Sequence, residues 1–268
     1  MGAQRATKNQ ASVLLQEALT LHQNDQGDRA ETLYRRILQL YPHHFDALQL
    51  LAILLAQRKD GATALCLFDR ALALQPHHAS THNNRGNALY DLHRYEEALD
   101  SYNRAITIWP DYANALYNRG NTLRELQRYE EALDSHHRAL QIKPDGEFWY
   151  GMSLHTKMKI CDWRDAENQW LQLAKKIEES DKVSTPFPVL ALLNSLPLQR
   201  KAAEVYVEAK YSPNNALGKI ALYPRHDKIR IGYFSADFHG HAMAYLLAEL
   251  FETHDKSTRV RQLRLLTN

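Results

Sequence analysis

The sequence predicts a mainly α-helical fold: an α-solenoid of helical hairpins, then a helical linker, then one β-strand–helix unit. Four prolines recur at a spacing of 34 residues, namely Pro42, Pro76, Pro110 and Pro144. Residues 145–227 keep largely helical apolar spacing without that proline period. From Lys228 the composition becomes β-branched and aromatic, which is typical of a buried strand.

Residues 9–144 are expected to form four hairpins of 34 residues each. With the proline counted as position 32, position 8 is small, position 20 is alanine and position 24 is aromatic or histidine. The residues are Ala18, Ala52, Gly86 and Gly120; Ala30, Ala64, Ala98 and Ala132; and Tyr34, Phe68, Tyr102 and His136. Small residues let paired helices approach closely, and proline ends the second helix. This period and pattern indicate the tetratricopeptide repeat.

Asparagines mark one face of the first helix in the third and fourth repeats. Positions 6 and 9 lie opposite the core side of that helix, and here they are Asn84, Asn87, Asn118 and Asn121. An amide both donates and accepts hydrogen bonds, so this face could bind the peptide groups of a polypeptide whatever its side chains. The sequence therefore predicts a groove for polypeptide substrates or protein partners. Duplication of ordinary surface residues would give the same pattern.

Two other repeated features have more than one interpretation. Arg85 and Arg119 stand at position 7, where leucine is usual, so their guanidinium groups reach either solvent or an acidic ligand. The pairs His43–His44 and His77–His78 follow repeat prolines and recur with the turn. No cysteine or carboxylate cluster accompanies them, so we expect no metal site. His136 replaces the usual aromatic residue, and packing is its expected role.

Composition restricts the classes of function. The chain has 33 basic and 31 acidic residues, a balance too even to indicate binding to nucleic acid or to a membrane surface. The longest apolar run, residues 50–56, is too short to span a bilayer, and the N-terminus carries no signal peptide pattern. We therefore expect a cytoplasmic protein, able to form a homo-oligomer. The two cysteines provide neither a disulfide framework nor a zinc cluster.

Three segments after the repeats carry a resemblance to a known family. They are CDW at 161–163, NSLPLQRKAAEVYVEAKY at 194–211 and KIRIGYFSADFHGHAMAYL at 228–246. Together with the repeats, from about residue 9 to about residue 257, they resemble the protein O-linked N-acetylglucosaminyltransferases and their bacterial relatives. In this comparison residues 228–257 look like the beginning of the first Rossmann-like lobe of a GT-B glycosyltransferase.

The resemblance implies transfer of N-acetylglucosamine from UDP-GlcNAc to Ser or Thr of proteins. It implies a catalytic His241 supported by Asp237, and no cofactor in this chain apart from that donor substrate. Residues 258–268 do not resemble the family's second strand and are interpreted as a divergent tail.

Since most of the catalytic region is missing, we expect a substrate-recruiting portion that is inactive by itself. The alternative is a non-enzymatic repeat scaffold that binds protein partners. A clamp for peptide carboxylates is disfavoured, because it needs a basic groove rather than neutral asparagines.

Overall fold

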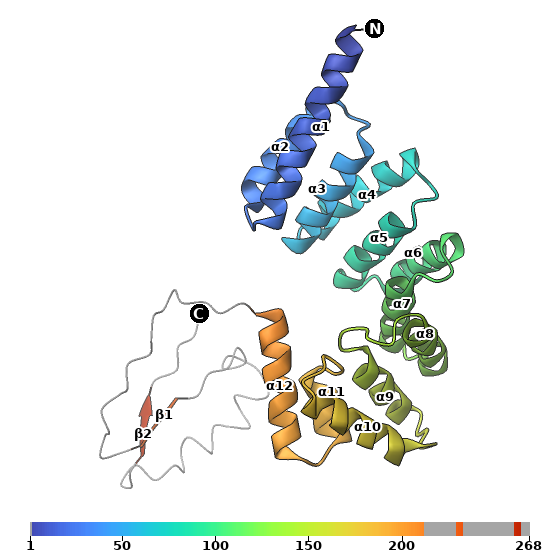
Figure 1. Ribbon diagram of the computed structural model, residues 1–268, viewed down its shortest axis with the longest axis vertical. Coiled ribbons are helices and arrows are strands. Elements are labelled where there is room, and N and C mark those ends of the chain that lie inside the picture. The colour runs from blue at the N-terminus through green and yellow to red at the C-terminus, as the bar shows by residue number, and fades with distance from the viewer. Residues whose placement is uncertain (1, 212–228, 233–259, 264–268) are drawn as a thin grey trace. The chain divides into compact units, whose positions relative to one another are not determined.

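In a computed structural model, residues 2–211, 229–232 and 260–263 are described, with side chains for residues 10–211. The chain divides into two units, residues 1–212 and 213–268. The described part of the first unit consists of helices (Figure 1). They are α1 (Gly2–Gln23), α2 (Gly27–Leu40), α3 (Phe45–Gln57), α4 (Gly61–Leu74), α5 (Ala79–Asp91), α6 (Tyr95–Ile108), α7 (Ala113–Glu125), α8 (Tyr129–Ile142), α9 (Trp149–Lys159), α10 (Ala166–Glu178), α11 (Pro186–Leu192) and α12 (Leu196–Lys210).

Helices α1 to α8 form four hairpins, and each hairpin packs against the next one. Their cores contain the small and aromatic residues that recur in the sequence: Ala18, Tyr34, Ala52, Phe68 and Tyr102 are all buried. Apolar residues of the first three hairpins join in one continuous cluster, because each hairpin covers the exposed apolar side of its neighbour. The predicted α-solenoid is therefore confirmed.

Close contacts between small and aromatic residues hold each hairpin together. A methyl group added at Gly86 would lie 2.6 Å from Cε1 of Tyr102, and one added at Gly120 would collide with His136. Tyr102 and His136 are both buried, as expected for position 24. Position 8 must therefore be small in these two hairpins, because the ring of the second helix occupies the space of a side chain.

The histidine pairs recur because they begin helices. The Nδ1 atom of His44 accepts the backbone N–H of Ala47 at 3.3 Å, at the start of α3. At the start of α5, the Nδ1 atom of His78 accepts the backbone N–H of Thr81 at 3.3 Å. Such N-caps satisfy backbone donors that lack a helical partner. Capping therefore explains the second histidine of each pair.

The turn inside each hairpin also repeats. A residue with positive φ follows the first helix at each 34-residue interval: Asp25 (57°), Lys59 (66°), His93 (58°) and Gln127 (60°). A left-handed residue at this place ends a helix and reverses the chain. None of the four is glycine, so each turn accepts a conformation that side chains disfavour.

Helices α9 to α12 enclose a separate apolar cluster. Its buried residues include Leu154, Leu173, Ile177, Val189 and Ala202. Segment 180–188, expected to be a loop, includes the beginning of α11 at Pro186. The linker residues up to 210 are thus largely helical, whereas residues 212–227 lie outside the described ranges.

The CDW motif does not begin a helix, contrary to the sequence-based expectation. It lies in the turn before α10, where Cys161 has a φ of 54°. The carboxylate of Asp162 accepts the backbone N–H of Arg164 at 3.1 Å and its Nε–H at 2.8 Å. These local hydrogen bonds stabilise the turn, so the helix begins only at Ala166.

In the second unit, the described residues are two strands, β1 (Ile229–Gly232) and β2 (Val260–Leu263). They pair in parallel, with Ile229 opposite Val260. β1 falls within the predicted strand segment. The residues expected to be a divergent tail contain β2, because strand formation depends on backbone pairing with a partner more than on composition. The helix expected over residues 242–254 is outside the described ranges, and a GT-B lobe is not shown.

Candidate functional site

The predicted asparagines lie on the first helices of neighbouring hairpins, α5 and α7. Asn84 and Asn87 line a hollow of about 260 Å³ whose other side is formed by α3. Apolar side chains of this hollow come from Ile53, Ala56 and Phe68. The Nδ2 atom of Asn118 lies 2.9 Å from Oδ1 of Asn87, so α7 continues the same polar surface. We call the surface formed by Asn83, Asn84, Asn87 and Asn118 the amide face.

Hydrogen bonds connect the members of the amide face. Asn118 donates from Nδ2 to Oδ1 of Asn83 at 3.1 Å as well as to Oδ1 of Asn87. Asn83 in turn donates to Oδ1 of Asn84 at 3.3 Å. The hydroxyl of Tyr102, on α6, donates to Oδ1 of Asn87 at 2.8 Å. These bonds fix how each amide is turned, because a carboxamide oxygen only accepts and its nitrogen only donates.

Sequence reasoning missed two members of this network, Asn83 and Tyr102. Asn83 is buried, and position 5 belongs to neither of the two positions that the helical pattern selects. Tyr102 was assigned to the core, and its ring is indeed buried, but its hydroxyl reaches Asn87. Position 24 faces positions 8 and 9 of the same hairpin, so a tyrosine there is the signal that could have revealed the contact.

Asn121 does not present a free amide. Its Oδ1 accepts a hydrogen bond from Nε2 of His136 at 3.2 Å. Burial raises the pKa of the Tyr117 hydroxyl, and a hydrogen bond from Asn121 opposes that rise. Both ends of the Asn121 amide therefore pair inside the protein, which separates this residue from the three other predicted asparagines.

His136 is a packing residue, as the sequence predicts. Its ring lies 5.3 Å from that of Tyr117, which stacks on Trp149 at 4.5 Å. Burial lowers the pKa of His136 to about 3, and the nearby Arg124 and His137 contribute to that shift. Its Nδ1 is buried without a hydrogen-bond partner among the described residues. The imidazole is therefore neutral at pH 7.

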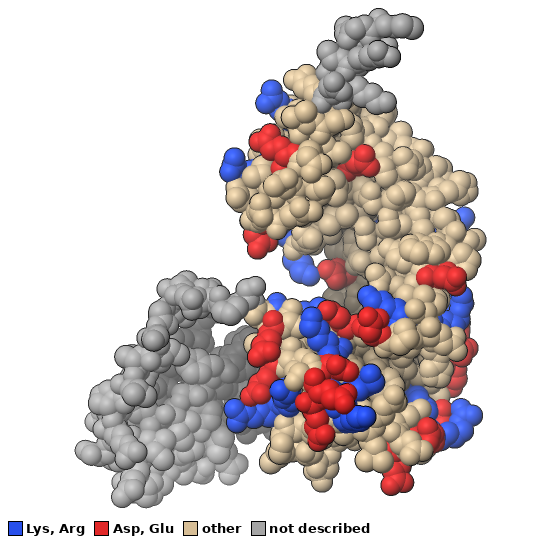
Figure 2. Space-filling view, viewed as in Figure 1, with Lys and Arg blue, Asp and Glu red and all other residues tan. Residues whose placement is uncertain are grey.

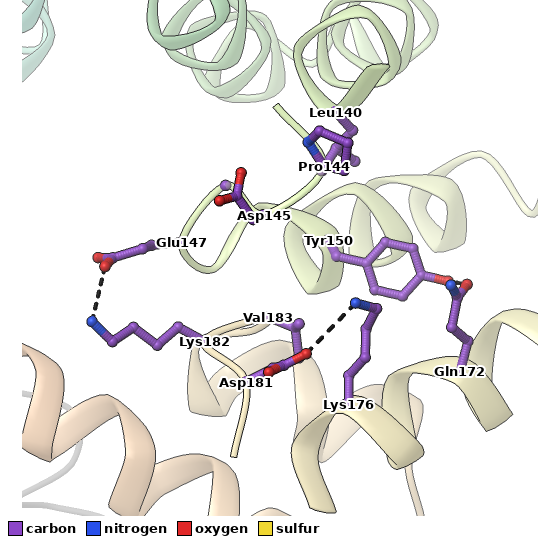
Figure 3. A pocket seen from close by; sticks show the side chains of 11 residues that line it. Leu140, Pro144, Asp145, Glu147, Tyr150, Gln172, Lys176, Asp181, Lys182 and Val183 are labelled. Atoms are coloured by element: carbon purple, nitrogen blue, oxygen red, sulfur yellow. Dashed lines mark hydrogen bonds and ion pairs between the residues drawn. The ribbon is translucent and has the colours of Figure 1, made fainter. Parts of the chain in front are cut away.

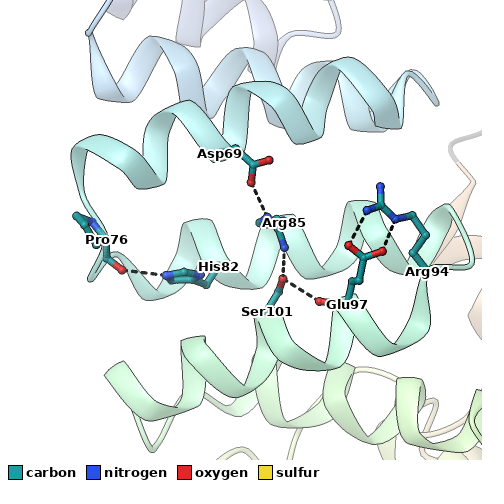
Figure 4. A network of polar contacts seen from close by, with 7 residues as sticks. All are labelled: Asp69, Pro76, His82, Arg85, Arg94, Glu97 and Ser101. Atoms are coloured by element: carbon teal, nitrogen blue, oxygen red, sulfur yellow. Dashed lines mark hydrogen bonds and ion pairs between the residues drawn. The ribbon is translucent and has the colours of Figure 1, made fainter.

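Arg85 and Arg119 join consecutive hairpins rather than reaching for a ligand. Figure 4 shows Arg85 between Asp69 of α4, 2.7 Å from Nε, and Ser101 of α6, 2.7 Å from Nη1. In the next hairpin, Arg119 donates from Nε to Oδ1 of Asn103 at 2.8 Å and from Nη1 to Oγ of Ser135 at 2.5 Å. The same device thus recurs one repeat later. It settles the question that the sequence left open for position 7.

Charges next to the amide face are paired. Lys59 and Asp91, which line the hollow, form an ion pair of 3.0 Å. Arg124 lies 3.7 Å from Glu125 and also contacts the sulfur of Met152. On the side shown in Figure 2, acidic and basic side chains are intermixed over α9 to α12. The described part of this surface therefore provides no excess of positive charge for a peptide carboxylate.

A larger hollow, of about 570 Å³, lies where α8, α9 and α10 meet (Figure 3). Its charged side chains pair with one another: Lys182 with Glu147 at 2.9 Å and Lys176 with Asp181 at 3.6 Å. The Tyr150 hydroxyl donates to Oε1 of Gln172 at 2.7 Å. Polar groups that already have partners leave little for a ligand to bind, so the amide face is the better candidate.

The predicted catalytic pair cannot be placed. His241 and Asp237 lie outside the described residues, so their roles stay predictions. Within the described ranges, no group of three or more His, Cys, Asp or Glu residues is arranged to hold a metal ion. None of the helices whose positions are given is both long and apolar enough to cross a membrane.

Two family matches cover the repeats. Residues 77–145 match the tetratricopeptide repeat, and residues 23–105 match subunit 3 of the anaphase-promoting complex, or cyclosome. No curated protein matches the chain. Neither match points to a glycosyltransferase, so the resemblance to O-linked N-acetylglucosaminyltransferases receives no support from them. They fit the alternative, a repeat scaffold, better.

Solved structures agree on the fold. PilF of Pseudomonas aeruginosa is 19% identical with a TM-score of 0.61, over 76% of this chain and 93% of its own. For MamA of Desulfovibrio magneticus RS-1 the values are 18% and 0.59, over 64% and 97%. For a thermophilic TPR protein of Thermus thermophilus they are 21% and 0.54, over 74% and 99%. The paired helices of this chain therefore have the tetratricopeptide-repeat fold.

Proposed function

We propose that this chain is a protein-interaction scaffold that holds an extended polypeptide against the amide face. The observation that carries the proposal is the hollow between α3 and α5, which places Asn84 and Asn87 beside the apolar side chains of Ile53, Ala56 and Phe68. An extended peptide offers the same combination of main-chain polar groups and uncharged side chains. Concave surfaces of helical repeats provide room for such a ligand.

The pairing of nearby charges supports a neutral, main-chain mode of binding. The cations closest to the amide face are occupied: Lys59 by Asp91, and Arg85 by Asp69. Affinity for a partner must therefore come from hydrogen bonds and apolar contacts more than from charge. We do not extend the proposal to sugar transfer, because no described residue contributes to it.

The test begins with a display library of random linear peptides. The library is selected on the wild-type protein and counter-selected on the double variant Asn84→Ala/Asn118→Ala. A selected peptide is then labelled with fluorescein and titrated by fluorescence anisotropy. We expect the double variant to lose about 0.5–1.5 kcal/mol of binding free energy per missing hydrogen bond. Helicity measured by circular dichroism should stay unchanged.

Asn194→Ala is the matched control, since Asn194 is exposed between α11 and α12, away from the repeats. It should bind the peptide as the wild type does. Failure to enrich any peptide, or equal affinity in the double variant and the wild type, would contradict the proposal.

A further inference from the structure

The side chain of Asn87 is held in one orientation. Its Oδ1 accepts two hydrogen bonds, one from the Tyr102 hydroxyl at 2.8 Å and one from Nδ2 of Asn118 at 2.9 Å. Two bonds use both lone pairs of a carboxamide oxygen. The Nδ2 group of Asn87 then points away from these partners, and among the described residues nothing accepts its hydrogens. Because Asn87 lines the hollow, this amide is available there as a donor.

Asn118 is held in the opposite sense. Its Nδ2 donates to Oδ1 of Asn83 at 3.1 Å and to Oδ1 of Asn87 at 2.9 Å. Both amide hydrogens are thereby used, since a carboxamide nitrogen carries two. Its Oδ1 has no partner in the described part of the chain and remains an acceptor. Asn84 repeats the sense of Asn87, because its Oδ1 accepts from Asn83 at 3.3 Å and leaves the nitrogen free.

The amide face therefore has a polarity: α5 offers donors and α7 offers an acceptor. In an antiparallel sheet, one residue of a strand exchanges both its N–H and its C=O with a single residue of the neighbour. The free amide of Asn87 and the free carbonyl of Asn118 offer the same donor and acceptor from two adjacent side chains. Only an extended residue with both groups on one edge can satisfy the two together.

We propose that Asn87 and Asn118 together read one residue of an extended peptide, and that this residue cannot be proline. This inference rests on the proposed function and adds the direction and the sequence restriction of the bound chain. The carbonyl oxygen of the peptide accepts from Nδ2 of Asn87, and its N–H donates to Oδ1 of Asn118. Proline at that place lacks the N–H. Tyr102 is a positioning residue that keeps the Asn87 amide facing the peptide.

A proline scan of the selected peptide tests the sequence restriction. Each position is replaced in turn by proline and, as the matched substitution, by alanine. We expect one position at which proline weakens binding at least about tenfold while alanine changes it by less than about twofold. Proline tolerated at every position would overturn this inference, whereas continued sensitivity to Asn84→Ala/Asn118→Ala would leave the scaffold function intact. Failure to enrich any peptide would overturn both.

The variant Asn87→Asp tests the polarity. An aspartate oxygen still accepts from Tyr102 and Asn118, but the second oxygen replaces the donor that faces the peptide. We expect at least about a tenfold loss of affinity with an unchanged melting temperature. Asn114→Asp, on the exposed start of α7, controls for the added charge and should bind normally. Unchanged or tighter binding by Asn87→Asp would show that the amides face the other way.

Tyr102→Phe separates positioning from packing. The ring remains, so the core is kept, while the hydroxyl that orients Asn87 is removed. We expect affinity to fall severalfold and the proline-sensitive position to become more tolerant, because the Asn87 amide can now turn. Loss of stability with an unchanged proline profile would assign Tyr102 a purely structural role.

Discussion

Position 24 shows how one site in the repeat can carry different chemistry. Tyr102 and His136 occupy it in consecutive hairpins, and both are buried against a glycine of the first helix. Each also sends a polar atom to an asparagine at position 9, at 2.8 Å for Tyr102 and 3.2 Å for His136. The tyrosine stays neutral over the whole working pH range, because burial raises its pKa. The histidine does not, because its ordinary pKa of 6.5 lies close to neutral pH.

We predict that His136 makes the protein sensitive to mild acid. Its pKa falls from 6.5 to about 3 in the folded chain, mainly through burial, so the unfolded chain binds the proton first. The stability that depends on neutral His136 is complete above about pH 6.5 and declines as the pH falls from there toward 3. The slope is roughly 1 kcal/mol per pH unit. His136→Tyr, which imitates Tyr102, should remove this contribution.

Urea unfolding at pH 7 and pH 5 measures the effect. Between these values, His136→Tyr should lose roughly 2 kcal/mol less of unfolding free energy than the wild type. His137→Gln is the control, because His137 is exposed on the same helix, and it should behave as the wild type does. The same pH dependence in His136→Tyr and the wild type would contradict the burial argument.

The candidate site was predictable by position but not by orientation. Helical spacing selects Asn84, Asn87, Asn118 and Asn121 from the sequence, and three of them do belong to one surface. Whether an amide is free depends on its partners in three dimensions. His136 occupies Asn121, and Asn83 connects two helices, although both facts require the distance between α5 and α7. No periodicity contains that distance.

At the scale of elements, the interfaces between hairpins combine apolar packing with the position-7 arginines. Arg119 is partly buried, and its guanidinium joins α6 to α8 through Asn103 and Ser135. Burial lowers its pKa, yet arginine remains charged at neutral pH. By contrast, Arg128 pairs with Glu131 three residues away on the surface of a single hairpin. The two arginines share a residue type and a repeat but connect different things.

Replacing these arginines should therefore have unequal effects. Arg119→Ala removes two hydrogen bonds and the packing of a side-chain stem between helices, and we expect unfolding free energy to fall by about 1–2 kcal/mol. Arg128→Ala breaks only an exposed ion pair and should leave stability almost unchanged. Urea denaturation of both variants makes the comparison. An equal effect of the two changes would mean that Arg119 does not stabilise the interface between hairpins.

The sequence predicts the helices of the repeats well and those of the linker less well. Inside the repeats, a 34-residue period supplies four independent observations of every helix end, including the capping His44 and His78. After Pro144 each signal occurs once. The CDW turn was assigned to a helix, because the hydrogen bonds from Asp162 to Arg164 that hold the turn leave no mark in the apolar pattern.

At the scale of the first unit, the linker helices stabilise one another around their own core. Leu173 and Ile177 of α10 pack with Val183 and Val189, which come from the following segment and α11. That segment also binds α9 through its backbone: the N–H of Gly151 donates to the carbonyl oxygen of Val183 at 2.8 Å. Residues 182–202 are therefore part of the same packed structure as α9 and α10. A boundary near residue 181, which sequence spacing suggests, cuts through this core.

We accordingly predict that a chain of residues 1–211 unfolds cooperatively, whereas one of residues 1–181 does not keep α9 and α10 folded. The shorter chain leaves Leu173 and Ile177 exposed, and each buried aliphatic side chain of this kind contributes about 1.5–3 kcal/mol. Thermal unfolding followed by circular dichroism should give a sharp transition for residues 1–211 and a lower helical signal for residues 1–181.

Leu173→Ala in the full chain provides the control without truncation, and it should cost about 2–5 kcal/mol because Leu173 is fully buried. If residues 1–181 melt as sharply as residues 1–211, with α9 and α10 intact, the apolar cluster does not hold these helices. The repeats would then end in a part of the chain that folds without α11 and α12.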